Sequence, residues 1–519
     1  MNRREFIIHG AAVSAMTAMG APMFTSCAHT HAVSKSPLNK NAIATSDGGG
    51  YFESNFGIDE DLVRKVLRAA TSLGGDFADI YFQHKVSDFV GFEDGQVNRA
   101  YAQVDLGAGI RVLKGEQTGY AYTEELTSAA LIKAAQTAAS IASSAPVKPV
   151  DTFHGVEIPR LYAEKPVWLD VAPADKISIA RRIGEKMLSL NPAVIKASTW
   201  FGDADEAVLI ANTEGVWVED IRPMTILYAN CAAEKDGRVE SNGFSRSARR
   251  GVEMYSDDLV NEIATQAVER TLLLFDATVP PAGEMPVVLA PATSGILLHE
   301  AMGHGFEADF NRKEISIFST MMNQSIAQDF VTIVDTALEK EARGAVNVDD
   351  EGCPGQSTTL VENGRLVSYL HDRISARHYN VAQTGNGRRE SFRAIPMPRM
   401  RVTTMENGPH SPEEIIKSVK KGLYAVDFAN GEVAIGAGDY SFYVKTGYLI
   451  EDGKLTAPVK DVNLIGNGPD SLKKITMVGN DKAIDWGTWT CGKDGQSVPV
   501  GLGLPTVKVS AITVGGVNS

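Results

Sequence analysis

The stretch His299-Glu300-Ala301-Met302-Gly303-His304 constrains the fold of this chain more than any other. Neutral imidazoles bind zinc, and a neighbouring glutamate that does not bind the metal can accept a proton from water. Zinc-binding histidines on a helix usually stand four residues apart, on one face. Here they stand five apart, which separates them by about 140° at roughly 100° per residue. A regular α-helix therefore cannot direct both side chains at one ion.

Gly303 directly precedes the second histidine and is where the helix could change its geometry. We expect the helix to end there or to take an extra π-type turn. The alternative is that both histidines are hydrogen-bonded core residues beside the apolar run 295–298 and bind no metal. The stretch alone leaves both interpretations open.

A third ligand is needed for a zinc site, and Cys491 is one candidate. It lies between glycine-rich turns, and the nearby Lys493 would favour its thiolate form. A thiolate and two imidazoles form a three-ligand zinc set with a fourth position open to water. Spacing alone does not choose among Cys491 and four competitors, Glu307, Asp309, His371 and His378.

Length and charge narrow the classes of protein. A chain of 519 residues is expected to form two or three domains. Its 44% hydrophobic and 22% charged content is typical of a soluble protein with a sizeable core. The net charge of −14, without a long basic run, argues against nucleic acid or an anionic membrane as the main partner.

The first 32 residues are predicted to be an export signal. Arg3-Arg4 precede a short apolar stretch, which indicates the twin-arginine route to the periplasm, with an ordinary secretory signal as the alternative. Phe24-Thr25-Ser26-Cys27 resembles a lipoprotein cleavage site, so Cys27 is a candidate lipid anchor and the one expected link to a membrane. Residues 33–55, rich in small and polar residues, are predicted to be a flexible leader.

The remaining cysteines are Cys231, Cys353 and Cys491. An odd number in an oxidising compartment leaves at least one thiol unpaired. Cys231 is expected to be buried and inert. Whether it forms a disulfide with Cys353 stays open.

The predicted fold class is α+β. Residues 56–280 are expected to form an N-terminal α/β domain of helices and antiparallel hairpins, with a sub-boundary near 146–168. Asp94-Gly95 predicts one hairpin turn. The expected helices cover 62–70, 124–143, 175–190 and 257–274, and the first expected strands cover 78–84, 88–93 and 96–104.

Residues 281–519 are expected to form a β-rich, barrel-like C-terminal catalytic domain. Asn363-Gly364 and Asp452-Gly453 predict two tight hairpin turns. One short helix is expected within 411–422. Many glycines in the last hundred residues fit strand bends and tight turns.

Several motifs together resemble one known family. The stretch 299–313 is similar to the signature of the TldD metalloproteases of the TldD/PmbA family. The likeness spans residues 285–507, and more faintly the chain from about 58. It continues through the segments 349–352, 384–391, 396–400, 465–468 and 491–496.

The resemblance implies a zinc-dependent peptidase that hydrolyses unfolded peptides or small proteins. Carried over by position, it implies His299, His304 and Cys491 as ligands of one Zn²⁺ and Glu300 as the catalytic base. It thereby favours Cys491 over the other candidates. It also implies a dimer, with a TldE/PmbA-type homologue or with a second copy, and an enclosed active site. The export signal departs from the cytoplasmic members of the family, so their substrates cannot simply be carried over.

Two rival functions are consistent with the same residues. One is a non-catalytic peptide-binding or chaperone-like subunit of a TldD/PmbA-type complex. The other is a structural zinc protein, whose fourth position a residue such as Glu307 would fill. For Arg388, Arg389 and Glu390 the sequence leaves two roles open, a buried ion-pair network and a grip on a peptide carboxylate.

Overall fold

The computed structural model describes residues 50–142 and 150–516. The predicted export signal, Cys27 and most of the predicted leader lie outside these residues. Tyr51–Phe56, placed in or beside the leader from composition, form helix α2. The carboxylate of Glu219 accepts hydrogen bonds from the backbone N–H groups of Tyr51 (2.6 Å) and Phe52 (3.2 Å), which fixes this helix to the sheet. No helix within the described ranges is both long and apolar enough to cross a membrane.

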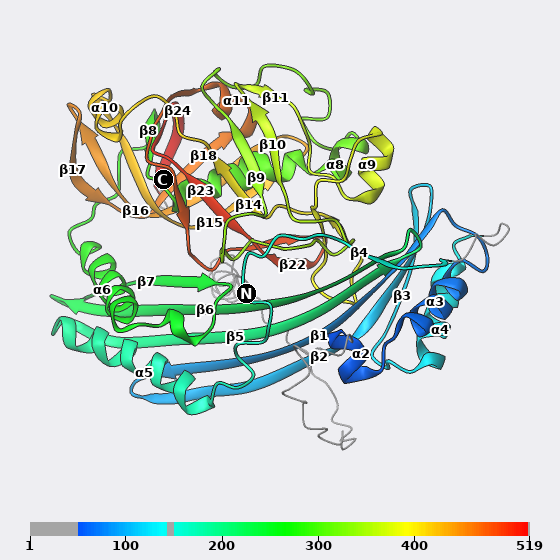
Figure 1. The fold of residues 1–519 in the computed structure, drawn as a ribbon. Helices are drawn as coiled ribbons and strands as arrows, with labels where there is room; N and C mark the ends of the chain where they lie inside the picture. The colour runs from blue at the N-terminus through cyan, green and yellow to red at the C-terminus, as the bar shows by residue number, and fades with distance from the viewer. Residues whose placement is uncertain (1–49, 143–149, 517–519) are drawn as a thin grey trace, which may run out of the picture. The chain divides into compact units, whose positions relative to one another are not determined.

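A twisted sheet of very long strands dominates the N-terminal region (Figure 1). Its strands follow the order β3-β2-β1-β5-β6, and both β4 and β7 pair with β6. Every pairing except that of β4 is antiparallel. The strands are β1 (Phe77–Glu93), β2 (Gln96–Lys114), β3 (Gln117–Thr123), β4 (His154–Gly155), β5 (Val194–Asn212), β6 (Val216–Lys235) and β7 (Arg238–Ala248).

The sequence predicted shorter strands than the structure contains. The predicted strands 78–84 and 88–93 are parts of the single strand β1. The polar residues between them interrupt the apolar pattern but not the ladder, because Lys85 pairs with Asp105 of β2 and with Glu206 of β5. The predicted turn at Asp94-Gly95 is confirmed, with both residues at positive φ.

Helices cover two separate parts of this sheet. One apolar core lies against α3 and α4, and another lies against α5 and α6. Asp59 caps α3, since its side chain accepts from Leu62 N–H at 2.7 Å. The helix predicted over 124–143 is shorter, because Thr127 caps it at its start. The bounds are α3 (Glu60–Ala70), α4 (Ser128–Ala139), α5 (Pro173–Leu190) and α6 (Asp257–Leu273).

The C-terminal region contains a closed barrel. Its strands follow the order β15-β8-β24-β18-β16, and the pairing of β15 with β16 closes the ring. The prediction of an α+β fold with a barrel-like C-terminal part is therefore confirmed. The ring consists of β8 (Gly283–Leu289), β15 (Lys421–Ala434), β16 (Asp439–Glu451), β18 (Val462–Asn467) and β24 (Val507–Gly516), with β17 (Lys454–Val459) and β19 (Ile475–Val478) attached.

A second C-terminal sheet follows the order β11-β10-β9-β14-β23-β20. Its strands are β9 (Ile333–Thr336), β10 (Ser357–Glu362), β11 (Arg365–Leu366), β14 (Val402–Met405), β20 (Ala483–Asp485) and β23 (Gly501–Leu504). Two small hairpins complete the region, β12 (Gly387–Arg388) with β13 (Met397–Pro398) and β21 (Thr490–Lys493) with β22 (Gln496–Pro499). The predicted turns at Asn363-Gly364 and Asp452-Gly453 are confirmed by pairing on both sides and by positive φ.

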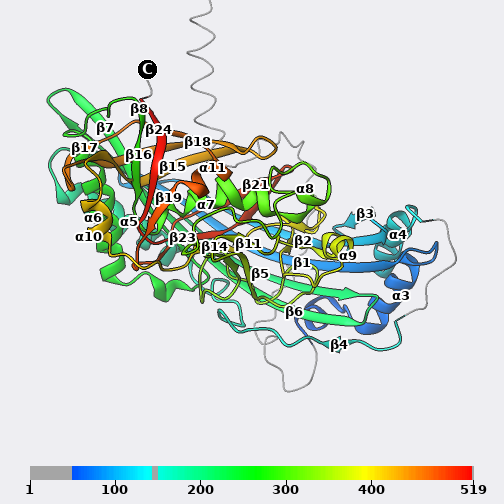
Figure 2. The same cartoon turned by 90° about the horizontal axis from the view of Figure 1, so that it is seen from above.

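Short helices connect these strands. Ser411 and Glu414 form a capping box at the start of α10, which confirms the helix predicted within 411–422. The others are α8 (Ala308–Arg312), α9 (Arg373–Tyr379) and α11 (Gly468–Lys473), and α10 covers Pro412–Lys417. Seen from above, the long strands extend past the C-terminal sheets towards α3 and α4 (Figure 2).

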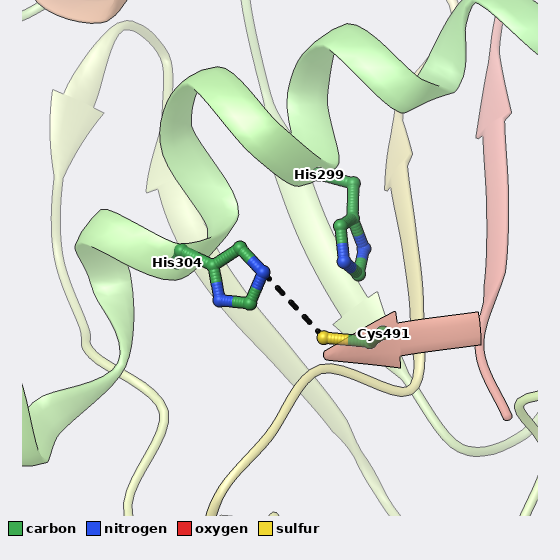
Figure 3. Close-up of side chains that lie close together, drawn as sticks. All are labelled: His299, His304 and Cys491. Atoms are coloured by element: carbon green, nitrogen blue, oxygen red, sulfur yellow. Dashed lines mark hydrogen bonds between the residues drawn. The ribbon is translucent and has the colours of Figure 1, made fainter. Parts of the chain in front are cut away.

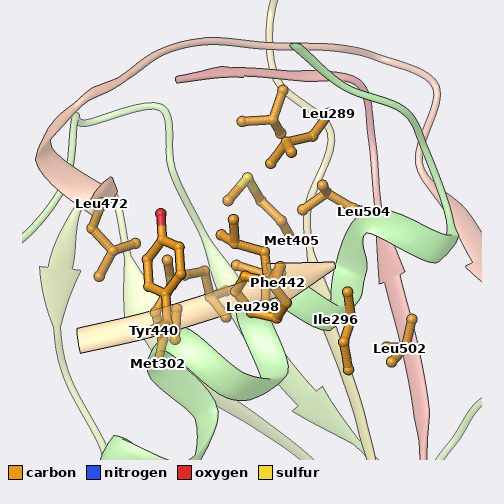
Figure 4. Packing of buried hydrophobic residues seen from close by; sticks show 14 of the residues in the cluster. Leu289, Ile296, Leu298, Met302, Met405, Tyr440, Phe442, Leu472, Leu502 and Leu504 are labelled. Carbon is orange, nitrogen blue, oxygen red and sulfur yellow. The ribbon is translucent and has the colours of Figure 1, made fainter. Parts of the chain in front are cut away.

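The largest apolar core surrounds the helical run that begins at residue 293. Leu298 and Met302 pack among Tyr440, Phe442 and Leu472 (Figure 4). Barrel strands thus bury one face of the run that carries both histidines. This packing fixes the run in place, although its backbone is irregular.

Candidate metal centre

The helix that carries both histidines changes its geometry at the predicted place. Helix α7 (Ile296–Leu298) leads into a π-helical turn over His299–Gly303, and a 3₁₀ turn over His304–Phe306 follows. The backbone N–H of His304 donates to the carbonyl of His299, the five-residue bond of a π turn. The predicted π-type turn is confirmed. It brings the two imidazole centroids to 5.1 Å.

Gly303 is the residue that this turn requires. A Cβ at position 303 would stand 2.0 Å from the sulfur of Met400, a buried residue. Only glycine leaves room for the turn to lie against Met400. The close approach, and not the backbone dihedral, explains the glycine.

Strand β21 brings Cys491 to the two histidines. Its Sγ lies 3.5 Å from Nε2 of His304 (Figure 3). One side-chain ligand atom from each of His299, His304 and Cys491 lies within 4.8 Å of the other two. Across the described residues, no fourth side chain joins this group.

The chemistry of the three donors fits a zinc ion. All three residues are buried, and Nδ1 of His299 has no hydrogen-bond partner among the described residues. Buried polar atoms are rarely left unpaired. Imidazole nitrogen and thiolate sulfur are both ligands that zinc takes in proteins.

Electrostatics favour the thiolate form of Cys491. Burial alone would raise the pKa of this thiol, but the charges and hydrogen bonds of His299 and His304 lower its pKa well below the usual value. Burial would lower the pKa of His304, but Glu307 and Cys491 raise it well above its usual value. The site therefore stabilises negative charge on sulfur and positive charge beside it. A divalent cation would supply the same positive charge.

Glu307 fixes the orientation of His304. Its Oε2 lies 3.0 Å from Nδ1 of His304 and 3.1 Å from Nζ of Lys493. Lys493 also donates to Asp309 at 2.7 Å. Burial would raise the pKa of Glu307, but Lys493 and His304 lower it to about 2, so the carboxylate is charged. With Nδ1 held by this carboxylate, Nε2 faces Cys491.

The remaining candidates for a third ligand lie elsewhere or serve another purpose. Asp309 is engaged by Lys493. His371 is buried against Tyr379, with 5.5 Å between ring centroids, and burial lowers its pKa to about 4. Nδ1 of His378 bonds to Glu116 at 2.6 Å.

Lys493 contacts the acidic residues near His304, whereas we expected it to act on Cys491. The sequence suggested that it favours the Cys491 thiolate, but its ammonium group binds the carboxylates that support His304. Two acidic residues soon after His304 and one lysine two residues after Cys491 are the sequence signal that could have indicated this ion pair.

Glu300 lies beside the three donors without joining them. Its Oε2 is 3.9 Å from Nε2 of His304, and 18% of its side chain is exposed. Burial raises the pKa of its carboxyl group above the usual value. A carboxylate that is partly exposed and has a raised pKa is suited to exchanging protons with a bound molecule.

Other sequence questions are answered by the same structure. Cys231 and Cys353 are both free thiols, and Cys231 is buried as expected. Arg388 and Arg389 form no ion pair within the part of the chain that is described, so the ion-pair network considered from the sequence is absent there. Arg388 donates to the carbonyls of Met400 (2.6 Å) and Pro499 (2.7 Å).

Known proteins resemble this chain along most of its length. Sequence models of three parts of the PmbA/TldA metallopeptidases match it: domain 1 over residues 78–142, the central domain over 166–275 and the C-terminal domain over 282–516. A metalloprotease TldD homolog of Haemophilus influenzae is 38% identical over 450 residues, which cover 85% of this chain and 93% of that protein. A zinc metalloprotease TldD homolog of Saccharolobus solfataricus is 28% identical, covering 87% and 99%.

Solved structures share the fold. TldE from Thermococcus kodakarensis superposes with a TM-score of 0.68 at 18% identity, covering 88% of this chain and all of that one (100%). A structure from Thermotoga maritima has a TM-score of 0.70 at 22% identity, with the same coverage. Taken with the three domain matches and the Haemophilus relative, this shows that the chain belongs to the TldD/PmbA family of metallopeptidases.

Proposed function

We propose that the chain is a zinc-dependent peptidase, with one zinc ion held by His299, His304 and Cys491. The observation that carries the proposal is the π turn, which brings two imidazoles to a thiolate that comes from far along the chain. Glu307 holds His304 in the orientation that a ligand needs. A relative named as a zinc metalloprotease agrees with this choice of metal.

Glu300 acts as the general base and acid. A zinc ion held by His299, His304 and Cys491 would supply Lewis-acid chemistry for peptide hydrolysis. The Glu300 carboxylate would take a proton from the attacking water and return it to the departing amine. Its raised pKa brings its proton affinity closer to that of both partners. Its partial exposure keeps it within reach of a substrate.

The donor set supports a catalytic rather than a structural zinc site. A structural site is usually closed by four protein ligands, whereas a catalytic site keeps one position open. Glu307, the fourth ligand considered from the sequence, is turned to Nδ1 of His304 and to Lys493. The three described donors therefore leave a position for water and substrate.

We extend the proposal to substrate, partner and location. The substrates are unfolded peptides or small proteins, and the partner is a TldE-type homologue or a second copy of the chain. The fold shared with TldE supports such a partner. The twin-arginine signal would place the protein in the periplasm. A reporter that is active after export only, fused behind residues 1–49, tests the location, and Arg3→Lys with Arg4→Lys should abolish its signal.

The deciding experiment is zinc per chain by elemental analysis. Wild type should carry about one zinc, and Cys491→Ala should lose it. Cys231→Ala is the matched control, because it removes an equally buried thiol from the N-terminal core. A wild type that stays metal-free when supplied with zinc would leave the non-catalytic peptide-binding subunit as the better function. Zinc retained by Cys491→Ala would reject the thiolate as a ligand.

A further inference from the structure

A cavity of about 380 Å³ lies between the long N-terminal sheet and the hairpin that carries Cys491. Strands β1, β5 and β6 contribute one wall, and Thr490, Ser497 and Pro499 of β21 and β22 contribute the other. Thr490, next to Cys491 in the chain, lines the cavity, and so does Val498, which pairs with Cys491 across the hairpin. The cavity therefore adjoins the strand that supplies the sulfur. Its volume is that of a small-ligand site.

Four arginines on its wall form no ion pair with a carboxylate within the described ranges. One of them, Arg389, donates to the hydroxyl of Tyr120 at 3.3 Å and to the carbonyl of Asp350 at 3.0 Å, and the other three are Arg249, Arg343 and Arg388. Arg388 donates to two backbone carbonyls, those of Met400 and Pro499. Arg343 donates to the carbonyl of Trp489 at 2.8 Å and to Oγ1 of Thr490 at 3.0 Å.

Arg249 is the third of these arginines. It lies over the ring of Tyr162, with 5.1 Å to the centroid, and its buried Nε has no partner among the described residues. Buried charges are normally paired. The buried Arg249 and Arg388 form no ion pair among the described residues, and neither does the half-buried Arg343.

The charge of Arg249 acts on the other two arginines. Burial, and then the charge of Arg249, lower the pKa of Arg343 to about 10. Burial lowers the pKa of Arg388 to about 9; the charge of Asp350 opposes this shift, and the charge of Arg249 adds to it. An anion bound among the three would offset the repulsion that Arg249 exerts on Arg343 and Arg388.

No carboxylate on the same walls forms an ion pair with these three arginines among the described residues. Asp88 and Asp203 bind Lys176, and Asp350 binds Arg222. Asp349 accepts backbone N–H groups of residues 351, 353 and 387. Glu206 accepts from Gln83, and Glu390 is exposed and forms no ion pair among the described residues. None contacts Arg249, Arg343 or Arg388.

We propose that this cavity binds the C-terminal carboxylate of a peptide, held by Arg249, Arg343 and Arg388. The inference rests on the proposed peptidase function, because a peptide is the molecule that brings a carboxylate to this hairpin. Guanidinium groups match a carboxylate with paired N–H donors. Asp349 and Asp350 on the same wall disfavour an anion with two charges, such as phosphate, over a carboxylate with one.

Binding, measured without cleavage, tests the proposal. Tetra-alanine with a free C-terminus and its C-terminal amide are titrated calorimetrically into the full-length chain, once with zinc removed and once as zinc-loaded Glu300→Gln. We expect the free acid to bind at least about tenfold more tightly than the amide, as a charge-assisted contact should provide.

Arg343→Gln should reduce this ratio towards one. Arg250→Gln should keep the preference for the free acid, since Arg250 directly follows Arg249 in the chain but does not line the cavity. Arg388→Gln is the second variant, in case Arg343→Gln fails to fold. The proposal is overturned if acid and amide bind equally, if their difference survives both substitutions, or if inorganic phosphate binds more tightly than the free acid.

The two proposals fail separately. A wild type that never takes up zinc would overturn the peptidase function. The preference for acid over amide in the zinc-free chain would still stand in that case. Loss of that preference in a chain that binds zinc and cleaves peptides would overturn the carboxylate site alone.

Discussion

The N-terminal sheet and the C-terminal barrel obey the same rules of pairing and burial, but they place their polar groups differently. In the sheet, β1 with β2, β2 with β3, β5 with β6 and β6 with β7 are simple antiparallel hairpins. Lys176 of α5 forms a buried ion pair with Asp203 of β5 at 2.8 Å.

In the C-terminal region, distant segments pair, such as β14 with β23 in parallel. A helix there breaks its own regularity to bring two histidines together. The difference teaches that regular hairpins satisfy the hydrogen bonds of their own backbone. A metal site instead needs side-chain donors that face a common point, and here an irregular turn, fixed by the packing of the apolar core, positions His299 and His304 in this way.

The largest expected effect comes from Glu300→Gln. The amide cannot accept the proton, so peptide hydrolysis should fall by about 10²- to 10⁴-fold, while zinc content stays at the wild-type value. Initial rates with an unfolded peptide and elemental analysis of the same sample measure both quantities. Full activity in this variant would remove Glu300 from the mechanism and weaken the contrast between the two regions.

Glu307→Gln should have the next largest effect. Loss of the charge behind His304 is expected to weaken zinc binding by about 10- to 100-fold, measured by competition with a chelating dye. Glu219→Gln provides the N-terminal comparison, because this half-buried carboxylate on β6 accepts hydrogen bonds from the first backbone N–H groups of α2. Glu219→Gln should destabilise helix α2 and leave the zinc affinity unchanged. Equal zinc loss in both variants would mean that general unfolding, not the support of His304, is being measured.

Gly303→Ala tests whether close packing enforces the π turn. The new Cβ would clash with Met400, and relief of such overpacking typically costs about 1–3 kcal/mol. We expect a lower unfolding temperature and reduced zinc content. Gly155→Ala in the N-terminal sheet meets nothing within 4 Å and should change neither. If Gly303→Ala changed neither the unfolding temperature nor the zinc content, the turn would not depend on this contact.

The smallest effect concerns the dependence of stability on pH. Burial lowers the pKa of His371 from 6.5 to about 4, so the folded chain binds fewer protons than the unfolded chain between those values. The contribution of His371 to stability is present above pH 6.5 and is lost as the pH falls towards 4. His371→Asn should flatten the fall in unfolding temperature across this window. His84 in the N-terminal sheet, whose pKa burial also lowers, serves for comparison through His84→Asn. An unchanged pH profile in His371→Asn would contradict the assignment.

Local features could be predicted because they depend on near neighbours. Asp94-Gly95, Asn363-Gly364 and Asp452-Gly453 form turns because these pairs tolerate positive φ. The caps at Asp59 and Ser411 need nothing beyond three or four residues of sequence. The ends of the long strands were predicted less well. Polar residues interrupt the apolar pattern of the sequence, but the backbone hydrogen bonds between the strands continue through them.

If both histidines bind one ion, their spacing of five residues excludes a regular α-helix, and this much follows from the order of the residues and the period of the helix. What surrounds the turn follows only from the folded chain. Folding brings Cys491 to His304 across 187 residues, turns Glu307 to the far side of the ring and places Arg249, Arg343 and Arg388 on the wall of one cavity. Such contacts depend on barrel closure and on core packing summed over the whole chain, and no short segment carries that information.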